Sequence, residues 1–319
     1  MKKICLSLVS LLILFSCQDD EKTTTATESR LAKRSCFSHE VHERQLSEDP
    51  KLAAKMNQIE AFTEKALSNN YRLVNGAIEI PVVVNVLYKT TAENISLAQI
   101  QSQIDVLNAD FNAANADYNQ VPSLFSGVKA NVGITFVLDQ VIRKSTTKKS
   151  WGTKDAMKKS SQGGLNPTSP TTKLNMWVCT IGNGILGYAQ FPGGSSATDG
   201  VVIDSKYFGV TSNSGPAYPY NLGRTATHEV GHWMNLRHIW GDATCGNDQV
   251  ADTPSHNAAN YGVPTFPHYS TCSGTPVEMT MNYMDYTDDR GMFMFTNGQK
   301  SRMAAIFLSG GPRFSFGQP

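Results

Sequence analysis

The sequence lacks a strong excess of charge of either sign. It carries 28 lysine and arginine residues against 27 aspartate and glutamate residues, a formal net charge of +1, so charge gives no reason to expect a nucleic-acid partner. Internal repeats are also absent. Hydrophobic residues at 40% and aromatic residues at 9% suit a folded core rather than a disordered chain. The 319 residues have room for one large domain and a smaller segment.

The apolar run at the N-terminus is too short to span a membrane comfortably. It extends from Ile4 to Phe15 behind two lysines, a pattern typical of a signal peptide. We therefore expect residues 1–16 to be a signal peptide. The stretch Leu14–Cys17 resembles a bacterial lipobox and predicts that Cys17 is lipidated. The alternative is an ordinary secretory signal in which Cys17 is incidental.

Residues 17–34 are polar and rich in threonine, which predicts a lipidated tether without a packed core. The acidic run directly after Cys17 resembles the surface-export signal of some bacterial lipoproteins. These features predict an exported protein on the bacterial outer membrane or cell surface. Its membrane contact would be the lipid on Cys17, and release after processing is an alternative.

Three histidines and a glutamate lie within eleven residues: His228, Glu229, His232 and His238. On a helix, His228 and His232 share a face and can hold one metal ion, while Glu229 stays beside it as a base. His238 reaches the same metal only if the chain turns sharply. Asn235 suits that turn because asparagine tolerates a positive φ. The alternative is an amphipathic helix with ordinary core or surface histidines.

A methionine in the stretch Met281–Tyr286 strengthens the metal interpretation. Met284 lies about fifty residues after the histidine motif, and a methionine in a tight turn at such a place is typical of metzincin proteases. By itself, Met284 would be a core residue. With the histidine helix, it predicts a hydrophobic floor beneath a metal ion.

Residues 78–308 resemble the pappalysin family of metzincin zinc metalloproteases, both in their motifs and in the order of those motifs. The matching stretches are Glu79–Tyr88, Leu174–Ile181, Gly187–Pro192, Asp199–Asp204, His228–His238, Val250–Pro254, Asn282–Tyr286 and Met294–Gln299. The departures are Asn235 for the common glycine and two absent cysteines. The resemblance implies an α+β fold with a twisted mixed sheet, a backing helix and an active-site helix. An irregular C-terminal subdomain with the Met-turn would follow.

The resemblance also implies roles for individual residues. The zinc ligands would be His228, His232 and His238. Glu229 would be the general base for a zinc-bound water, and Tyr286 would stabilise the oxyanion. The implied activity is that of a zinc endopeptidase acting on proteins or peptides. A catalytically silent surface module with a structural zinc site is the alternative, but such a site would not need Glu229.

The segment ahead of the expected catalytic domain (77–319) is interpreted as a propeptide, residues 35–76. Cys36 stands alone in it, and a thiolate is a soft ligand for zinc. Several zymogens that resemble this family use such a cysteine as a fourth zinc ligand, a cysteine switch that keeps the enzyme silent. The alternative is an unpaired cysteine without a role.

The chain has six cysteines: Cys5, Cys17, Cys36, Cys179, Cys245 and Cys272. The first would leave with the signal peptide. Cys179 lies in an apolar run and is expected to be a buried thiol. Cys245 and Cys272 flank the loop after the histidine helix, and a disulfide there would stabilise an exported protein by about 3–4 kcal/mol. The positions of a second bridge in the family match Val263 and Gly291.

Calcium is a second expected cofactor. The stretch Cys245–Pro254 offers hard oxygen ligands. The family likeness indicates Asp248, Thr253 and the carbonyl of Val250, with Asp252 a weaker candidate. A plain acidic loop is the alternative.

Cleavage specificity rests on the residues after the Met-turn. Some members of the family cut before basic residues and use an acidic group at this place. Asp288 and Asp289 are the candidates, although Arg290 follows them and would change the local field. The sequence therefore leaves the preference open, as it does the oligomeric state.

Pattern and turn signals predict several elements. Strands are expected at Glu79–Tyr88, Val132–Asp139 and Leu174–Ile181. A helix is expected at Leu46–Asn70 and an amphipathic helix at Ile95–Asn115. The first helix would have Asp49 as its N-cap and Pro50 at its first position. The basic stretch Arg143–Lys159 is interpreted as a solvated loop rather than a polyanion site. His39 and His42 are expected to be ordinary propeptide residues.

Overall fold

The computed structural model describes residues 33–68 and 78–317. The predictions for the signal peptide, for lipidation of Cys17 and for a propeptide boundary near Ala77 fall outside these ranges. Within them, no helix combines the length and the apolar character that crossing a membrane requires.

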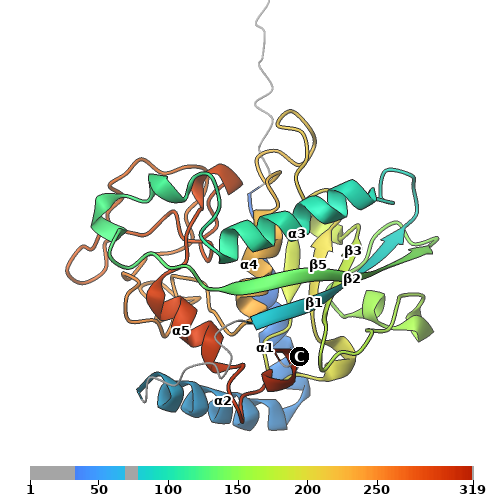
Figure 1. Cartoon of the computed structure of the whole chain (residues 1–319), viewed down its shortest axis with the longest axis horizontal. Helices are drawn as coiled ribbons and strands as arrows, with labels where there is room; N and C mark the ends of the chain where they lie inside the picture. The colour runs from blue at the N-terminus through green and yellow to red at the C-terminus, as the bar shows by residue number, and fades with distance from the viewer. Residues whose placement is uncertain (1–32, 69–77, 318–319) are drawn as a thin grey trace, which may run out of the picture. The chain divides into compact units, whose positions relative to one another are not determined.

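A five-stranded sheet in the order β2-β1-β3-β5-β4 carries the fold (Figure 1). The strands are β1 (Ile78–Tyr88), β2 (Ile134–Ser145), β3 (Leu174–Cys179), β4 (Gly187–Ala189) and β5 (Val201–Asp204). All neighbouring strands run parallel except the pair of β4 and β5. Cys36 makes an isolated parallel bridge to Gly187 on the edge strand β4. The edge of the sheet therefore lies beside the segment that precedes it in the chain.

Two helices cover one face of the sheet, α3 (Leu97–Phe111) and α4 (Arg224–Trp233). Alternate strand residues point to this face and to a second core around Trp151, as the two-residue period of a strand requires. The side chain of Ser96 caps α3 by accepting a hydrogen bond from the backbone N–H of Gln99. The helix is shorter at both ends than the predicted Ile95–Asn115.

The N-terminal segment (residues 33–68) contains two helices where the sequence predicted one. These are α1 (Ser38–Glu48) and α2 (Pro50–Ser68), separated by the extended residue Asp49. The side chain of Asp49 accepts a hydrogen bond from the N–H of Lys51 (3.0 Å). The predicted start at Pro50 is correct, but residues 46–48 end another helix. Proline disfavours helical backbone in the residue before it, which explains the break.

The C-terminal part is irregular and contains α5 (Asn297–Ala305). A capping box of Thr296 and Gln299 begins this helix. The predicted α+β fold is confirmed, with α3 as the backing helix and α4 as the helix that carries the histidine motif. The prediction that Arg143–Lys159 is a solvated loop was wrong in part. The strand β2 takes in its first residues as far as Ser145, and Trp151, Met157 and Lys158 are buried.

A disulfide joins Cys245 and Cys272, the pair that the sequence indicated. Cys179 is a buried free thiol. Val263 and Gly291 are neighbours, because a Cβ on Gly291 would lie 3.2 Å from Cγ2 of Val263. The two positions that resemble those of a second bridge are therefore close in space, which fits their loss as a pair.

Candidate active site

The helix α4 positions the first two histidines and the glutamate. Its residues are all buried, and the rings of His228 and His232 lie 4.8 Å apart between centroids. Met284 packs against the same helix, since a Cβ on Gly231 would lie only 2.5 Å from its sulfur. Glycine at position 231 is what permits this approach. The methionine is thus part of the floor of the histidine cluster.

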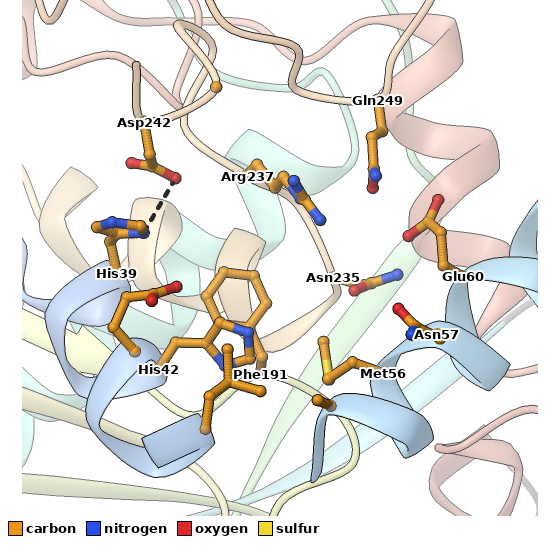
Figure 2. A pocket seen from close by; sticks show the side chains of 14 residues that line it. His39, His42, Met56, Asn57, Glu60, Phe191, Asn235, Arg237, Asp242 and Gln249 are labelled. Carbon is orange, nitrogen blue, oxygen red and sulfur yellow. Dashed lines mark ion pairs between the residues drawn. The ribbon is translucent and has the colours of Figure 1, made fainter. Parts of the chain in front are cut away.

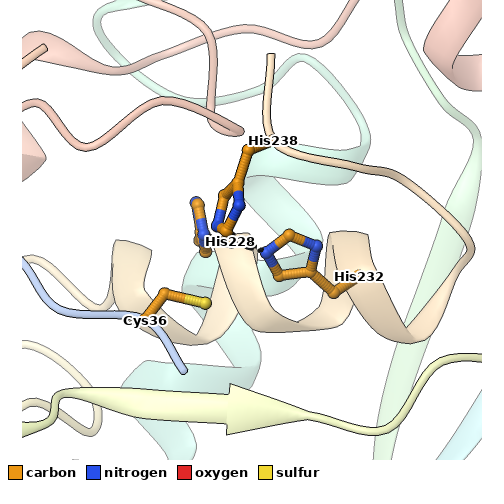
Figure 3. A group of neighbouring side chains, drawn as sticks. All are labelled: Cys36, His228, His232 and His238. Atoms are coloured by element: carbon orange, nitrogen blue, oxygen red, sulfur yellow. Dashed lines mark hydrogen bonds between the residues drawn. The ribbon is translucent and has the colours of Figure 1, made fainter. Parts of the chain in front are cut away.

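The chain reverses after α4 at Asn235, which has a φ of 72°. This left-handed residue allows the turn that the sequence required of it. The turn brings Nε2 of His238 to 3.0 Å from Nε2 of His232, which lies 3.2 Å from that of His228 (Figure 3). Three imidazoles therefore converge through the same ring nitrogen.

Acceptors at Nδ1 fix the tautomer of these rings. The pairs are His228 with the carbonyl of Tyr283 (2.6 Å), His232 with the carbonyl of Leu236 (2.8 Å) and His238 with the carboxylate of Asp242. These oxygens only accept, so Nδ1 carries the proton and Nε2 presents a lone pair. Such partners are typical of histidines that bind metal through the other nitrogen.

The converging lone pairs fit a cation. Neutral nitrogens this close repel one another unless a positive ion lies between them. Protonation does not relieve the repulsion, because burial, followed by the neighbouring histidines, lowers the pKa of His228 and of His232. Three neutral imidazoles with a further open position are the donor set that catalytic Zn²⁺ prefers.

The thiol of Cys36 completes the group. Ligand atoms of Cys36 and the three histidines all lie within 4.8 Å of one another, and all four residues are buried (Figure 3). No second group of this kind occurs in residues 33–68 and 78–317. Burial, followed by the charge of Glu229, raises the pKa of the thiol. A thiolate at this place therefore requires a cation beside it, and the geometry fits a fourth metal ligand.

Glu229 faces the N-terminal segment next to the cluster. Its Oε2 accepts a hydrogen bond from the hydroxyl of Ser38 (2.7 Å) and lies 3.3 Å from the sulfur of Cys36. Burial raises the pKa of Glu229 to about 7, which suits a group that takes and returns a proton near neutral pH. Gly187 makes room for it, since a Cβ there would lie 3.1 Å from Cγ of Glu229.

Tyr286 presents a hydrogen-bond donor beside the cluster. Its hydroxyl donates to the carbonyl of Cys36 (3.0 Å), and its ring centroid lies 5.0 Å from that of His238. Burial raises the pKa of Tyr286 well above its usual value, so the hydroxyl keeps its proton. A donor aimed at a carbonyl beside the histidine cluster is what oxyanion stabilisation needs.

Arg34 occupies a buried acidic pocket, a contact that the sequence did not predict. Its guanidinium pairs with Asp289, donates to the carbonyl of Thr287 (3.2 Å) and lies 4.8 Å from the ring centroid of Tyr220. Both charged side chains are almost fully buried. The pocket therefore recognises a guanidinium by charge, hydrogen bonding and stacking together.

The start of α4 holds Asp289 in place. One carboxylate oxygen accepts the N–H groups of Leu222 (2.8 Å) and Arg224 (3.3 Å), which leaves the other for Arg34. Arg290 is exposed, and its charge acts on Asp288 instead, where it opposes the increase in pKa that burial causes. Of the two aspartates named from the sequence, Asp289 is therefore the one that lines the pocket.

Three of the expected calcium ligands lie together. The hydroxyl of Thr253 is 2.8 Å from a carboxylate oxygen of Asp248 and 2.8 Å from the carbonyl of Val250. Burial raises the pKa of Asp248 to about 6, so a bound cation would relieve the cost of its buried charge. Asp252 does not join this group, because its oxygens accept hydrogen bonds from Thr296 and Gly298.

Ser38 and Asp242 were also missed, although the sequence holds a signal for both. Arg34 and Ser38 lie two residues to either side of Cys36. Alternate residues of an extended segment point the same way. An extended segment around Cys36 therefore predicts that the side chains of Arg34, Cys36 and Ser38 face the same surface. Asp242 follows His238 by four residues and is the acidic side chain that orients that ring.

Comparisons with known proteins agree with this geometry. Residues 174–308 match the peptidase M43 family, described as pregnancy-associated plasma protein-A. An extracellular metalloprotease of Verticillium alfalfae is 32% identical over 244 residues, covering 72% of this chain and 79% of the relative. The structure of mature mirolysin of Tannerella forsythia with a cleaved peptide is 45% identical with a TM-score of 0.72. The match covers 76% of this chain and 96% of that one.

A structure of a Tannerella forsythia promirolysin mutant is also similar, with 41% identity and a TM-score of 0.79. That match covers 89% of this chain and 97% of the other. The family likeness seen in the motifs, the shared fold and the metalloprotease relatives all agree. This chain belongs to the pappalysin family of metzincin zinc metalloproteases.

Proposed function

We propose that the protein is an endopeptidase made as a zymogen. In this proposal His228, His232 and His238 hold the catalytic zinc, and Glu229 is the general base. The observation that carries it is the convergence of three Nε2 lone pairs beside a buried carboxylate and a buried thiol. The peptide substrate lies along the edge strand β4 and adds to it through backbone hydrogen bonds.

Each protein group has a distinct task in the reaction. The metal, when bound, supplies Lewis acidity that polarises the peptide carbonyl and acidifies a water molecule. Glu229 takes the proton of the attacking water and passes it to the leaving amine. Tyr286 donates its hydroxyl proton in a hydrogen bond to the developing oxyanion. The close packing of Met284 against Gly231 fixes the position of α4, and with it the positions of His228 and His232.

The N-terminal segment is proposed to be the inhibitory propeptide, with Cys36 as the fourth metal ligand. The match to promirolysin covers 89% of this chain against 76% for mature mirolysin, which supports a removable segment. Ser38 adds to the inhibition in this proposal. Its hydroxyl engages Glu229 and also accepts the N–H of Ala189 on β4 (2.8 Å), a donor that a bound substrate would use.

Chelation should separate two proposed metals. After treatment with a strong chelator, peptide hydrolysis should be lost and should return when Zn²⁺ is added.

Addition of Ca²⁺ should instead restore the melting temperature of the chelated protein, because Asp248, Thr253 and the Val250 carbonyl would bind it. Asp248→Asn should weaken that effect. Metal analysis, hydrolysis and melting curves measure these results. Full activity in a preparation free of zinc would contradict the zinc assignment, and an unchanged melting temperature would contradict the calcium assignment.

The Asp289 pocket is proposed to bind the basic residue just after the scissile bond. Arg34 would occupy it in the zymogen as that residue does in a substrate. We expect Asp289→Asn to lower kcat/KM for arginine-containing peptides by about 10- to 100-fold relative to a matched leucine peptide, because a charged hydrogen bond is lost. Asparagine can still accept the N–H groups of Leu222 and Arg224.

The matched control for that experiment is Asp105→Asn, at an exposed position on α3. This variant should keep the preference for arginine peptides. If Asp289→Asn and Asp105→Asn show the same ratio of arginine to leucine cleavage, the pocket does not set the specificity.

The relatives named extracellular metalloproteases support export. We propose that the chain reaches the bacterial surface through its signal peptide and is held there by a lipid on Cys17. Replacing Cys17 by serine should move the protein from the membrane fraction to the medium. Retention in the membrane fraction would contradict this anchor.

A further inference from the structure

A cavity of about 340 Å³ lies between the N-terminal segment and the loop that follows α4. Figure 2 shows side chains from both sides facing it. The N-terminal segment contributes Glu43 and Glu60, and the protease side contributes Asn235, Arg237 and Gln249. On the catalytic side, Arg237 is the cation of this lining. The carboxylate of Asp242 lies on the same side, with one oxygen 3.6 Å from Nδ1 of His39 and the other bonded to His238.

Arg302 of α5 provides a second guanidinium at this place. Its side chain is 2% exposed and donates to both carboxylate oxygens of Glu60, at 2.7 and 2.6 Å. Its Nε donates to the carbonyl of Asn235 (2.8 Å), and one Nη donates to Gln249 (2.9 Å). The last two contacts belong to the catalytic side, so they fix the orientation of the guanidinium whether or not Glu60 is present.

Removal of the N-terminal segment takes away the carboxylate that pairs with Arg302. Asp248 is near enough for the charge of Arg302 to oppose the increase in its pKa that burial causes. The oxygens of Asp248 are, however, bonded to Thr253 and to the N–H of Val250. A nearly buried, pre-oriented guanidinium without its bidentate partner attracts another carboxylate. The exposed side chain of Arg237 adds to that attraction.

The cavity and the Asp289 pocket lie at opposite ends of α4. Asp289 is bonded to the N–H of Arg224 at the start of the helix, whereas Asn235 and Arg237 follow its end. The helix is about 15 Å long, and His228 and His232 lie between its ends. A peptide that puts its basic residue in the Asp289 pocket must therefore extend its preceding residues toward the cavity.

We propose that Arg302 and Arg237 form a binding subsite for an acidic side chain ahead of the scissile bond, and that Glu60 occupies this subsite in the zymogen. The inference rests on the proposed function. Its substrate class is a peptide with a carboxylate before the cleaved bond and a basic residue directly after it. At about 3.3 Å per residue of extended chain, the carboxylate lies roughly two to four residues before the bond.

Matched peptides test this subsite with the enzyme matured from the full-length chain. Each peptide has arginine after the bond, and glutamate, glutamine or lysine at one position ahead of it. The positions ahead of the bond are tested one at a time. At the position that reaches the subsite, the glutamate peptide should have a KM about tenfold lower than the glutamine peptide. Lysine should give a higher KM than either. The difference should shrink as salt is added, because part of the attraction comes from an exposed charge.

Three variants locate the effect. Arg302→Gln and Arg237→Gln should each move the glutamate-to-glutamine ratio of kcat/KM toward one. The exposed Arg237 gives a second test if Arg302→Gln does not fold, and Lys149→Gln, at an exposed site in the basic stretch, should leave the ratio unchanged. Equal cleavage of glutamate and glutamine peptides at every position would contradict the acidic subsite but not the proposed function. Failure to cleave any peptide would instead contradict the proposed function.

Discussion

Replacing Glu229 by glutamine should reduce peptide hydrolysis by about three orders of magnitude, within the range typical of a lost general base. Glutamine keeps the size of the side chain and its hydrogen bond with Ser38, but it cannot take a proton from water. The zinc content should not change, because Glu229 is not among the converging ligands. Steady-state hydrolysis of a peptide and metal analysis of the same sample would measure both quantities.

Glu79→Gln is the control for that variant, at an exposed position on β1, and it should retain full activity. Glu229→Gln should also keep its N-terminal segment if removal of the segment is autocatalytic. Equal hydrolysis by native protein and Glu229→Gln would contradict the role of the base. It would favour the interpretation that the histidine cluster holds a structural metal in a binding module.

Replacing Cys36 by alanine should raise the activity of the full-length protein roughly tenfold or more, because the proposed contact between its thiolate and the metal would be lost. Alanine offers no electron pair to a metal, so the position proposed for the thiolate would become available to water. The contacts of Ser38 with Glu229 and Ala189 remain in this variant, so we expect partial rather than complete release. Activity and chain length, followed together over time, would measure the effect.

Cys179→Ala is the matched control. Cys179 is also a buried free thiol, but it belongs to the second core around Trp151. It should leave latency unchanged. The double variant of Cys36 and Ser38 to alanine should be more active than Cys36→Ala. Unchanged latency in Cys36→Ala would mean that the segment inhibits by covering the cleft and through Ser38 alone.

The sequence predicted the sheet and the helix that carries the site because both are strongly periodic. The strands β1 and β3 are nearly continuous apolar runs, and α3 repeats its apolar residues with helical spacing. The spacing of His228 and His232 specifies one face of one helix, and Asn235 is one of few residues that favour the following turn. Local geometry alone therefore brings these residues together.

The contacts of Arg34 and Glu60 could not be predicted in the same way. Arg34 meets Asp289 across 255 positions, and Glu60 meets Arg302 across 242, so only the tertiary fold brings them together. The helix α1 was missed because its apolar pattern is weak and most of its residues are polar. Its position depends on contacts with the body of the protein rather than on its own sequence.

The parallel bridge between Cys36 and Gly187 has a consequence for the direction of the chain. In the N-terminal segment, Arg34 in the Asp289 pocket comes before the residue at the histidine cluster. In a substrate cut before a basic residue, that residue comes after the cleaved bond. With that residue in the Asp289 pocket, as proposed above, a substrate would run along β4 in the direction opposite to that of the N-terminal segment. A peptide bond has a carbonyl end and an amide end. In a chain that runs in the opposite direction, the amide nitrogen of the peptide bond at the histidine cluster lies on the side where a substrate has its carbonyl carbon. We therefore expect the enzyme to hold the N-terminal segment in its cleft without hydrolysing it, so that the cut that frees the protease falls elsewhere in the chain.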